Sequence, residues 1–285
     1  MNLLTRAFRR LAWIGVVVLL AVGVSGCATP SVPQAGTEHG GGAPHSWEAF
    51  PENARFDYQL GGAYVPPSGT AVVVRDRGAK PEPGLYSVCY INAFQTQPGE
   101  QAKWPAALLL RDAKGVVADP DWPDEVLLDT STPEKRERIV DRVGEWIRGC
   151  ASGGFQAVEF DNLDSFVRSG GRLSFTNNLL AAKELASTAH QAGLAAGQKN
   201  AAEHTSELRE VAGFDFAVSE ECAAFDECGS YTSVYGGAVI DIEYADALPR
   251  SFEVMCSDPE SPASMILRDR KLLTSGDPSH LYRRC

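Results

Sequence analysis

The chain has 285 residues, of which 44% are hydrophobic, and it carries 37 acidic and 26 basic side chains for a formal net charge of −11 at pH 7. This acidic balance argues against nucleic-acid binding, because contacts with phosphates require a basic surface. It favours a cationic partner, although solubility alone would account for most of the charge. The length and the hydrophobic content are enough for one domain with a large core.

The N-terminal residues have the composition of an export signal. Arg6, Arg9 and Arg10 precede an apolar run over residues 11–24, and small residues then lead to Cys27. This pattern predicts a secretory signal peptide over residues 1–26, with a lipid attached to Cys27 after cleavage. The run is shorter than the roughly 20 apolar residues that usually cross a bilayer, which argues against a transmembrane anchor. Cleavage would remove three arginines and no acid, so the net charge would change from −11 to −14.

Residues 27–46 consist largely of Thr, Pro, Gly, Gln and Ser, and they predict a flexible tether between the lipid and the folded domain. The protein is therefore expected to be exported and lipid-anchored at the cell envelope or the cell surface, with the lipid as its only contact with the membrane. Two of the five histidines lie in this tether, and the other three show no spacing typical of metal ligands. We expect no metal site and no cofactor.

The folded part is predicted over residues 47–258 as alternating strands and helices. Five strand patterns occupy residues 87–92, 157–161, 194–199, 214–220 and 238–243. The clearest helix begins at Thr132 and Pro133 and ends at residues 152–154, and a second one covers residues 174–191. Such alternation predicts a parallel sheet, and roughly 250 residues is the usual size of a (β/α)8 barrel. We therefore predict an α/β fold, a single-domain TIM barrel, with a last strand near residues 252–256 and a C-terminal tail over residues 259–285.

Six cysteines remain besides Cys27, and an even number in an exported chain predicts disulfides. The expected pairs are Cys222 with Cys228, Cys256 with Cys285, and Cys89 with Cys150. Six cysteines allow 15 connectivities, and the sequence favours the first of these pairs most, because it closes a short loop.

The alternation of side chains within the strands indicates which face carries polar groups, since successive residues point to opposite faces. In residues 158–161 the apolar side chains share one face, and Glu159 and Asp161 share the other. Residues 240–243 repeat this pattern, and residues 216–219 place their small and polar members on the second face. We expect the acidic face to point into the barrel, because the inner face of barrel strands leads to an active site.

The carboxyl ends of parallel barrel strands meet at one mouth, so polar residues at these ends should converge. They are Asp57, Asn92, Asp129, Asp161, Glu221 and Glu243. Two carboxyl groups on either side of a sugar are the minimum for glycoside hydrolysis: one protonates the leaving oxygen, and the other attacks or stabilises the anomeric carbon. Burial and like charges would raise the pKa of one carboxyl group in such a cluster, as an acid catalyst requires.

Several segments together resemble a known enzyme family. They are Phe56-Asp57-Tyr58-Gln59-Leu60, Cys89-Tyr90-Ile91-Asn92-Ala93-Phe94, Asp119-Pro120-Asp121-Trp122, Leu128-Asp129-Thr130-Ser131, Glu159-Phe160-Asp161-Asn162-Leu163-Asp164, Gly197-Gln198-Lys199-Asn200 and Glu220-Glu221-Cys222. In this order they resemble glycoside hydrolase family 114, whose members are described as endo-α-1,4-polygalactosaminidases, and the resemblance covers residues 47–246. It implies a (β/α)8 barrel that cleaves internal α-1,4 bonds in partly deacetylated galactosamine polymers.

The resemblance implies a pair of catalytic acids, which correspond here to Asp161 and Glu221. We assign Asp161 as nucleophile or stabiliser and Glu221 as general acid/base, although the two roles could be exchanged. Glu159, on the same face as Asp161 and one layer deeper, would orient its neighbours or hold their protonation state. Glu220 has the opposite parity from Glu221 and should point away, unless the strand has already ended.

The implied substrate is a cationic amino-sugar polysaccharide, for which further binding residues can be named. The candidates are Asp57, Asp129, Asp164 and Glu243 for ammonium groups; Tyr58, Tyr90 and Tyr235 for sugar faces or packing at the rim; Lys199 and Asn200 for hydroxyl groups or for holding a carboxylate ionised; and Asn92, Asn162 and Glu159 as further contacts.

Two other classes of function remain open, since fold alone does not determine function. A catalytically silent carbohydrate-binding lipoprotein of the same fold would bind the polysaccharide without turnover. A structural surface protein would use the barrel for partner binding and have no affinity for polysaccharide. In each case we expect a monomer.

Overall fold

The computed structural model describes residues 46–285. The predicted signal peptide, Cys27 and nearly all of the predicted tether lie outside the described residues. None of the helices between residues 46 and 285 is long and apolar enough to cross a membrane.

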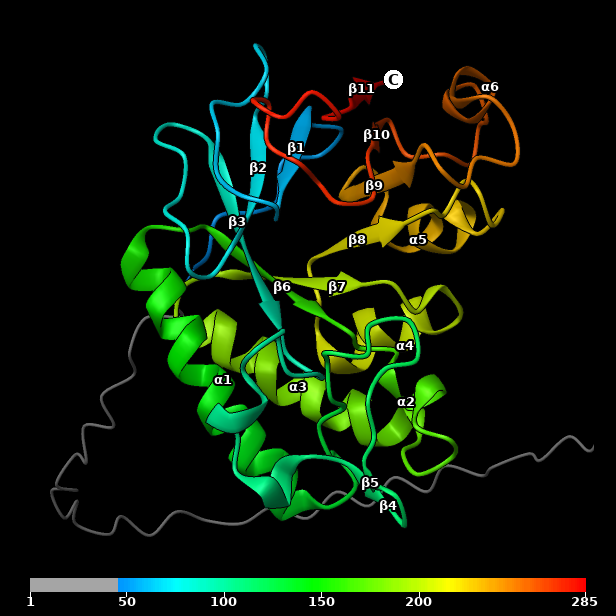
Figure 1. Ribbon diagram of the computed structural model, residues 1–285. Coiled ribbons are helices and arrows are strands. Elements are labelled where there is room, and N and C mark those ends of the chain that lie inside the picture. The colour runs from blue at the N-terminus through cyan, green and yellow to red at the C-terminus, as the bar shows by residue number, and fades with distance from the viewer. Residues whose placement is uncertain (1–45) are drawn as a thin grey trace, which may run out of the picture. The chain divides into compact units, whose positions relative to one another are not determined.

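The sheet has nine strands in the order β1-β2-β3-β6-β7-β8-β9-β10-β11. Their bounds are β1 Phe56–Gln59, β2 Val72–Asp76, β3 Tyr86–Asn92, β6 Ala157–Asp161, β7 Ala195–Lys199, β8 Phe216–Glu220, β9 Val239–Tyr244, β10 Ser264–Arg268 and β11 Tyr282–Arg284. Neighbouring strands from β1 to β10 pair in parallel, and β11 pairs antiparallel with β10. The sheet curls so that β1 and β10 come close (Figure 1). The predicted (β/α)8 barrel is confirmed.

Side chains, rather than a strand ladder, join the two ends of the curled sheet. Within residues 46–285 no ladder links β1 to β10 or β11. Instead, the buried guanidinium of Arg268 on β10 lies 3.3 Å from the buried carboxylate of Asp57 and donates a hydrogen bond to the Tyr58 carbonyl. The Tyr282 hydroxyl on β11 donates to the Phe56 carbonyl at 2.8 Å. These contacts close the barrel.

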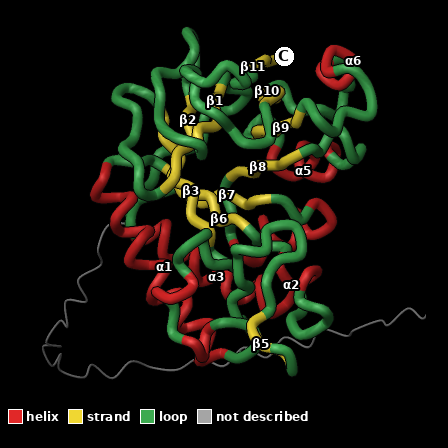
Figure 2. The backbone as a smooth tube through the Cα atoms, viewed as in Figure 1, coloured by secondary structure: helices red, strands yellow, loops and turns green. Residues whose placement is uncertain are grey.

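Helices follow β3, β6, β7, β8 and β9, whereas the β1–β2, β2–β3 and β10–β11 connections contain none (Figure 2). The helices are α1 Pro133–Gly153, α2 Ser165–Arg168, α3 Phe175–Gln191, α4 Thr205–Glu207, α5 Cys228–Tyr235 and α6 Phe252–Cys256, with a π-helical turn at Leu208–Ala212 after α4. Short 3-10 turns at Gln101–Lys103, Ala106–Leu108 and Ala202–His204 and a small hairpin of β4 (Arg111–Asp112) and β5 (Gly115–Val116) complete the elements.

The two long helices begin and end at the residues that the sequence predicts. The Thr132 hydroxyl caps α1 by accepting the Lys135 amide, Pro133 occupies the first turn, and Gly154 takes a left-handed conformation at the end. In α3 the Ser174 and Asn177 side chains form a capping box. Burial of one apolar face of each helix against the sheet then stabilises both.

Aromatic side chains fill the end of the barrel at which the parallel strands begin. Phe216 on β8 points against Gly197 on β7, where an added Cβ would lie 2.5 Å from the phenyl ring. Phe50 stacks on Phe216 with ring centroids 4.3 Å apart and meets the edge of Tyr86 at 5.6 Å. Only glycine therefore fits at position 197 without moving this cluster.

All three predicted disulfides are present. Cys89 is bonded to Cys150, Cys222 to Cys228, and Cys256 to Cys285. The first joins β3 to the end of α1, the second closes the loop after β8, and the third joins the end of α6 to the C-terminal residue. Three disulfides are typical of an exported protein.

The prediction for the C-terminal part is wrong. Residues 252–256 form α6 rather than the last strand, and the Ser251 hydroxyl caps this helix by accepting the Val254 amide. The last parallel strand is β10, which pairs with β9. The barrel therefore continues through β10 and β11, beyond the boundary predicted at residue 258.

Candidate active site

An open cavity of about 260 Å³ lies at the carboxyl ends of the central strands. Polar and charged side chains dominate its wall. The lining residues are Leu60, Tyr90, Asp119, Asp121, Trp122, Glu125, Asp161, Asn162, Asp164, Arg168, Lys199, Asn200, Glu220, Tyr244, Arg270 and Leu272.

The buried ammonium of Lys199, at the end of β7, is the centre of this site. Its Nζ lies 3.5 Å from Asp161, 3.4 Å from Glu220 and 3.6 Å from Glu159. Burial alone would lower the pKa of Lys199, but the three carboxylates raise it well above its usual value. The lysine is therefore a permanent cation that holds acids from β6 and β8 together.

A tyrosine donates a hydrogen bond to each of these acids. Tyr90 donates to Asp161 at 2.6 Å, and Tyr244 donates to Glu220. Tyr58 donates to Glu159 at 2.6 Å and itself accepts from Lys199 at 2.9 Å. Each acid is thus oriented by a rigid aromatic donor as well as by the lysine.

Glu159 lies beneath the cavity and does not line it. Its side chain is fully buried and contacts Tyr58 and Lys199. Burial raises its pKa to about 7, although Lys199 and the hydrogen bond from Tyr58 favour the charged form. This placement agrees with the prediction of an acid one layer deeper than Asp161.

Acids from the β3–α1 connection form the opposite wall. The Asn162 amide donates to Asn92 at 3.0 Å, and the Asn92 amide donates to Glu125 at 2.8 Å. Burial raises the pKa of Glu125 to about 7, and Asp161 and Asp119 act in the same direction. The wall therefore carries a carboxyl group that changes charge near neutral pH.

Arg168 on α2 stabilises this wall through two ion pairs. Its guanidinium lies 2.5 Å from Asp119 and 2.8 Å from Asp164. Asp119 also accepts the backbone amides of Asp121 and Trp122, at 2.9 and 3.2 Å. The buried Asp119 carboxylate therefore holds the turn that presents Asp121 and Trp122 to the cavity.

The two glutamates that end β8 face opposite to the prediction. Glu220 lines the cavity and contacts Lys199 and Tyr244. Glu221 has a left-handed backbone with φ of 62°, and its carboxylate accepts from Arg270 at 2.8 and 3.2 Å. The expectation that Glu221 faces the site and that Glu220 points away is wrong, because Phe216 and Glu220, rather than Ser219 and Glu221, lie on the inner face of β8.

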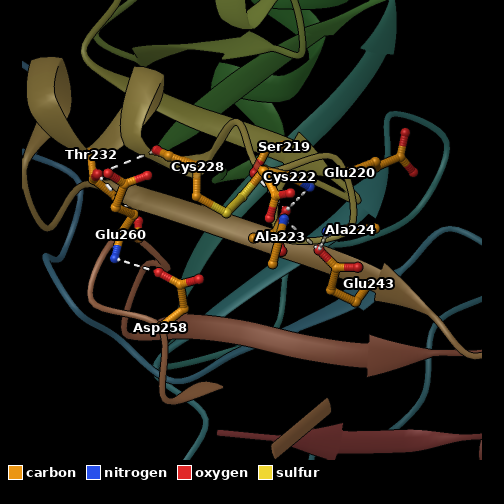
Figure 3. Close-up of a disulfide and its surroundings, with 12 residues drawn as sticks. Ser219, Glu220, Cys222, Ala223, Ala224, Cys228, Thr232, Glu243, Asp258 and Glu260 are labelled. Atoms are coloured by element: carbon orange, nitrogen blue, oxygen red, sulfur yellow. Dashed lines mark hydrogen bonds between the residues drawn. A yellow bond between two sulfur atoms is a disulfide. The ribbon is translucent and has the colours of Figure 1, made fainter. Parts of the chain in front are cut away.

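The acids of β9 also face opposite to the prediction. Tyr244 shares the inner face, so Asp241 and Glu243 lie on the outer one. Glu243 accepts the Ala223 amide at 2.8 Å (Figure 3), and Asp241 accepts the Ser219 hydroxyl at 2.7 Å. Both carboxyl groups are buried and have raised pKa values, mainly through burial. These hydrogen bonds hold the loop after β8 from the outer face of the sheet. Glu243 is therefore not available to substrate.

Three other predicted substrate contacts lie elsewhere. Asp57 is fully buried and pairs with Arg268 at the seam of the barrel. Asp129 pairs with Lys135 at 2.5 Å in the first turn of α1. Tyr235 lies on α5 and donates to Gln198 at 2.9 Å. These side chains stabilise the fold and do not line the cavity.

Most of the remaining predictions fall in or beside the cavity. Tyr90, Asp161, Asn162, Asp164, Lys199 and Asn200 line it, while Asn92, Tyr58 and Glu159 support lining residues. The sequence patterns did not indicate Asp119, Asp121, Trp122, Glu125, Arg168, Glu220, Tyr244 or Arg270 as site residues. Arg168 follows Asp164 by four positions on one helix face, a spacing that favours an ion pair. No local pattern indicates Arg270.

Within residues 46–285, one group of side chains has ligand atoms close enough to hold a metal: Cys222, Cys228 and Asp241. Both sulfurs of this group are bonded to each other in a disulfide. It therefore offers no thiolate ligand.

Comparison with known proteins identifies the family. The sequence profile of glycoside hydrolase family GH114 matches residues 37–285. The crystal structure of Aspergillus fumigatus Ega3 in complex with galactosamine is similar at 19% identity, over 86% of this chain and 100% of that chain, with a TM-score of 0.67. The glycoside hydrolase domain of PelA from Pseudomonas aeruginosa is similar at 17% identity, over 76% of this chain and 95% of that chain, with a TM-score of 0.52. No curated protein sequence matches the chain. Because the profile covers all of the described residues, the chain belongs to glycoside hydrolase family GH114.

Proposed function

We propose that the protein is an exported glycoside hydrolase that cleaves internal α-1,4 bonds of a partly deacetylated galactosamine-type polysaccharide, with Asp161 and Glu220 as its catalytic acids. The observation that carries the proposal is that both carboxylates line one cavity and contact the same lysine ammonium. Glu220 replaces Glu221 in the pair expected from sequence, because the Glu221 carboxylate is bound to Arg270.

We propose a retaining mechanism for the two acids. The Asp161 and Glu220 oxygens lie 3.5 and 3.4 Å from the Lys199 Nζ, so they are at most about 7 Å apart; this bound includes the separation of about 5–5.5 Å in retaining enzymes and excludes most of the range of about 6.5–9.5 Å in inverting enzymes. In the first step Asp161 would attack the anomeric carbon while Glu220 gives a proton to the leaving oxygen. In the second step Glu220 would take a proton from the water that releases the sugar.

The surrounding side chains would keep this pair in place during both steps. Lys199 bridges the two acids, and Tyr90 and Tyr244 each donate to one of them, so neither carboxylate can rotate without losing a charged or hydroxyl partner. Glu159 would hold Lys199 from below. Side chains fixed before substrate arrives need little reorganisation in the transition state.

The cavity is suited to a cationic sugar chain. Six carboxyl groups line it against three basic side chains, and the deacetylated polymer carries ammonium groups that acids attract. The structure of the similar Ega3 protein contains galactosamine. Trp122, with 57% of its surface exposed at the rim, would supply a ring face for a sugar. We further propose that Cys27 carries a lipid that anchors the enzyme at the cell envelope.

The test is reducing-end release from partly deacetylated α-1,4-galactosamine polymer by the protein and by Asp161→Asn. We expect a loss of at least about 100-fold in the variant, a size typical of a removed catalytic acid. Asp141→Asn, on the exposed face of α1, is the matched control and should retain full activity. Binding of the polymer without release of ends would support a silent carbohydrate-binding protein instead, and absence of both would refute the substrate class.

A further inference from the structure

Arg270 is a basic side chain in the wall of a cavity proposed to bind a cationic sugar. It lies in the segment between β10 and β11 and lines the cavity beside Glu220 and Tyr244. Its guanidinium contacts Glu221 at 2.8 Å and Asp246 at 2.9 Å, and it lies 4.4 Å from the centre of the Tyr244 ring. Two carboxylates and an aromatic face are a typical site for a cation. Here the protein supplies that cation itself.

The segment that carries Arg270 is held firmly. The Asp269 carboxylate accepts the Leu273 amide at 3.0 Å and the Leu281 amide at 3.2 Å, which fixes both ends of the loop. Two planar hydrogen-bonded contacts to carboxylates then fix the guanidinium itself. The positive charge is therefore a permanent part of this wall.

Charge is distributed unevenly across the cavity as a result. On the Arg270 side the guanidinium lines the cavity, whereas its partners Glu221 and Asp246 do not, so a ligand there meets the cation although the three groups together carry one net negative charge. On the opposite side the carboxylates themselves line the cavity: Asp119 and Asp164 share Arg168, and Asp121 and Glu125 form no ion pair with any basic group among residues 46–285. A sugar ammonium would therefore be attracted toward Asp121 and Glu125 and repelled by the fixed guanidinium beside Glu220.

We propose that Arg270 sets the acetylation specificity of the cavity: the sugar beside Glu220 must be uncharged and N-acetylated, whereas a sugar near Asp121 and Glu125 carries a free amine. This inference rests on the proposed function. Because Glu220 is proposed as the general acid, the sugar beside it is the leaving one, which becomes the new non-reducing end of the product. Cleavage would then occur where a partly acetylated chain presents an acetylated residue on that side.

The test is mass-spectrometric sequencing of the product ends released from partly N-acetylated α-1,4-galactosamine oligosaccharides. We compare the full protein with Arg270→Gln, Arg270→Met and Arg270→Lys, and use Arg283→Gln as a control, since Arg283 pairs with Glu253 outside the cavity. The expected result is an excess of N-acetylated new non-reducing ends for the wild type, Arg270→Lys and Arg283→Gln. Arg270→Gln and Arg270→Met should lose this excess and should cleave fully deacetylated polymer about tenfold faster relative to the partly acetylated one.

The outcomes separate this inference from the proposed function. If the wild type releases ends but Arg270→Gln and Arg270→Met keep the same end composition, Arg270 does not set specificity and only this inference fails. New non-reducing ends rich in free amine in the wild type would overturn it as well. If the wild type releases no ends from any amino-sugar polymer, the proposed function and this inference fail together.

Discussion

The buried acid Glu159 gives a quantitative prediction for the pH dependence of stability. Burial raises its pKa from 4.5 to about 7 in the folded protein. A carboxyl group with a raised folded pKa stabilises the fold below its unfolded pKa, and that contribution is lost as the pH rises through the folded pKa. Each pKa unit is worth about 1.4 kcal/mol, so the wild type should lose about 3 kcal/mol through Glu159 between pH 4.5 and pH 7.

Glu159→Gln removes this titration while keeping the size of the side chain and an acceptor for Tyr58. The free energy of unfolding of the variant, measured by urea denaturation with the disulfides intact, should therefore rise by about 3 kcal/mol relative to the wild type between pH 4 and pH 8. Other titrating groups are common to both proteins and largely cancel in the difference. Glu184→Gln, on the exposed face of α3, is the control and should show no such change. A difference between Glu159→Gln and wild type that does not vary with pH would refute the reasoning.

Two further predictions concern the packing of the barrel and its longest helix. Gly197→Ala would place a methyl group 2.5 Å from the Phe216 ring and should lower the free energy of unfolding by about 1–3 kcal/mol. Gly149→Ala in α1, where an added methyl group meets nothing within 4 Å, should raise it by about 0.5–1 kcal/mol. Equal effects of the two substitutions on the thermal midpoint would contradict the packing argument. Thr132→Ala removes the cap that accepts the Lys135 amide and should cost about 1 kcal/mol in urea denaturation, while Thr132→Ser should retain it; a neutral Thr132→Ala would show that the cap is dispensable.

Local patterns in the sequence predict the central part of the barrel well. The strands expected near residues 87–92, 157–161, 194–199, 214–220 and 238–243 correspond to β3, β6, β7, β8 and β9. Helix α1 follows directly from the cap at Thr132 and the glycines after residue 152. The patterns do not reveal β1, β2 and β10. Strand β1 alternates apolar and polar residues but is only four residues long, and the cores of β2 and β10 are continuous apolar runs without alternation, as in strands buried on both faces.

Residues 252–256 show why the C-terminal part could not be assigned. Four of these five residues are apolar, and so short an apolar segment fits a strand or one helical turn equally well. The helix forms because Ser251 caps it and because the Cys256–Cys285 disulfide joins it to the C-terminal residue. The partner that decides the structure therefore lies 29 positions away in the chain.

Alternation within strands explains both the correct and the wrong parts of the predicted site. Glu159 and Asp161 share a face with Lys199, as their parity predicts. The same pattern in β9 is reversed in space, because backbone amides of the β8–α5 loop satisfy the buried carboxylate of Glu243. Sequence alternation cannot tell whether the acidic face of a strand points into the barrel, as in β6, or outward, as in β9, since a buried acid is stable wherever hydrogen-bond donors face it. Arg270 could not be predicted at all, because its contacts depend on how the barrel closes.

The most direct test of the proposed mechanism compares the two neighbouring glutamates at the end of β8. Glu220→Gln and Glu221→Gln are matched substitutions one residue apart, and initial rates of reducing-end release should be measured for both on the same galactosamine polymer. We predict that Glu220→Gln loses at least about 100-fold, as expected for a general acid/base, and that Glu221→Gln remains within about tenfold of the wild type. A loss of 100-fold in Glu221→Gln together with near-normal activity of Glu220→Gln would contradict the assignment of Asp161 and Glu220 as the catalytic pair.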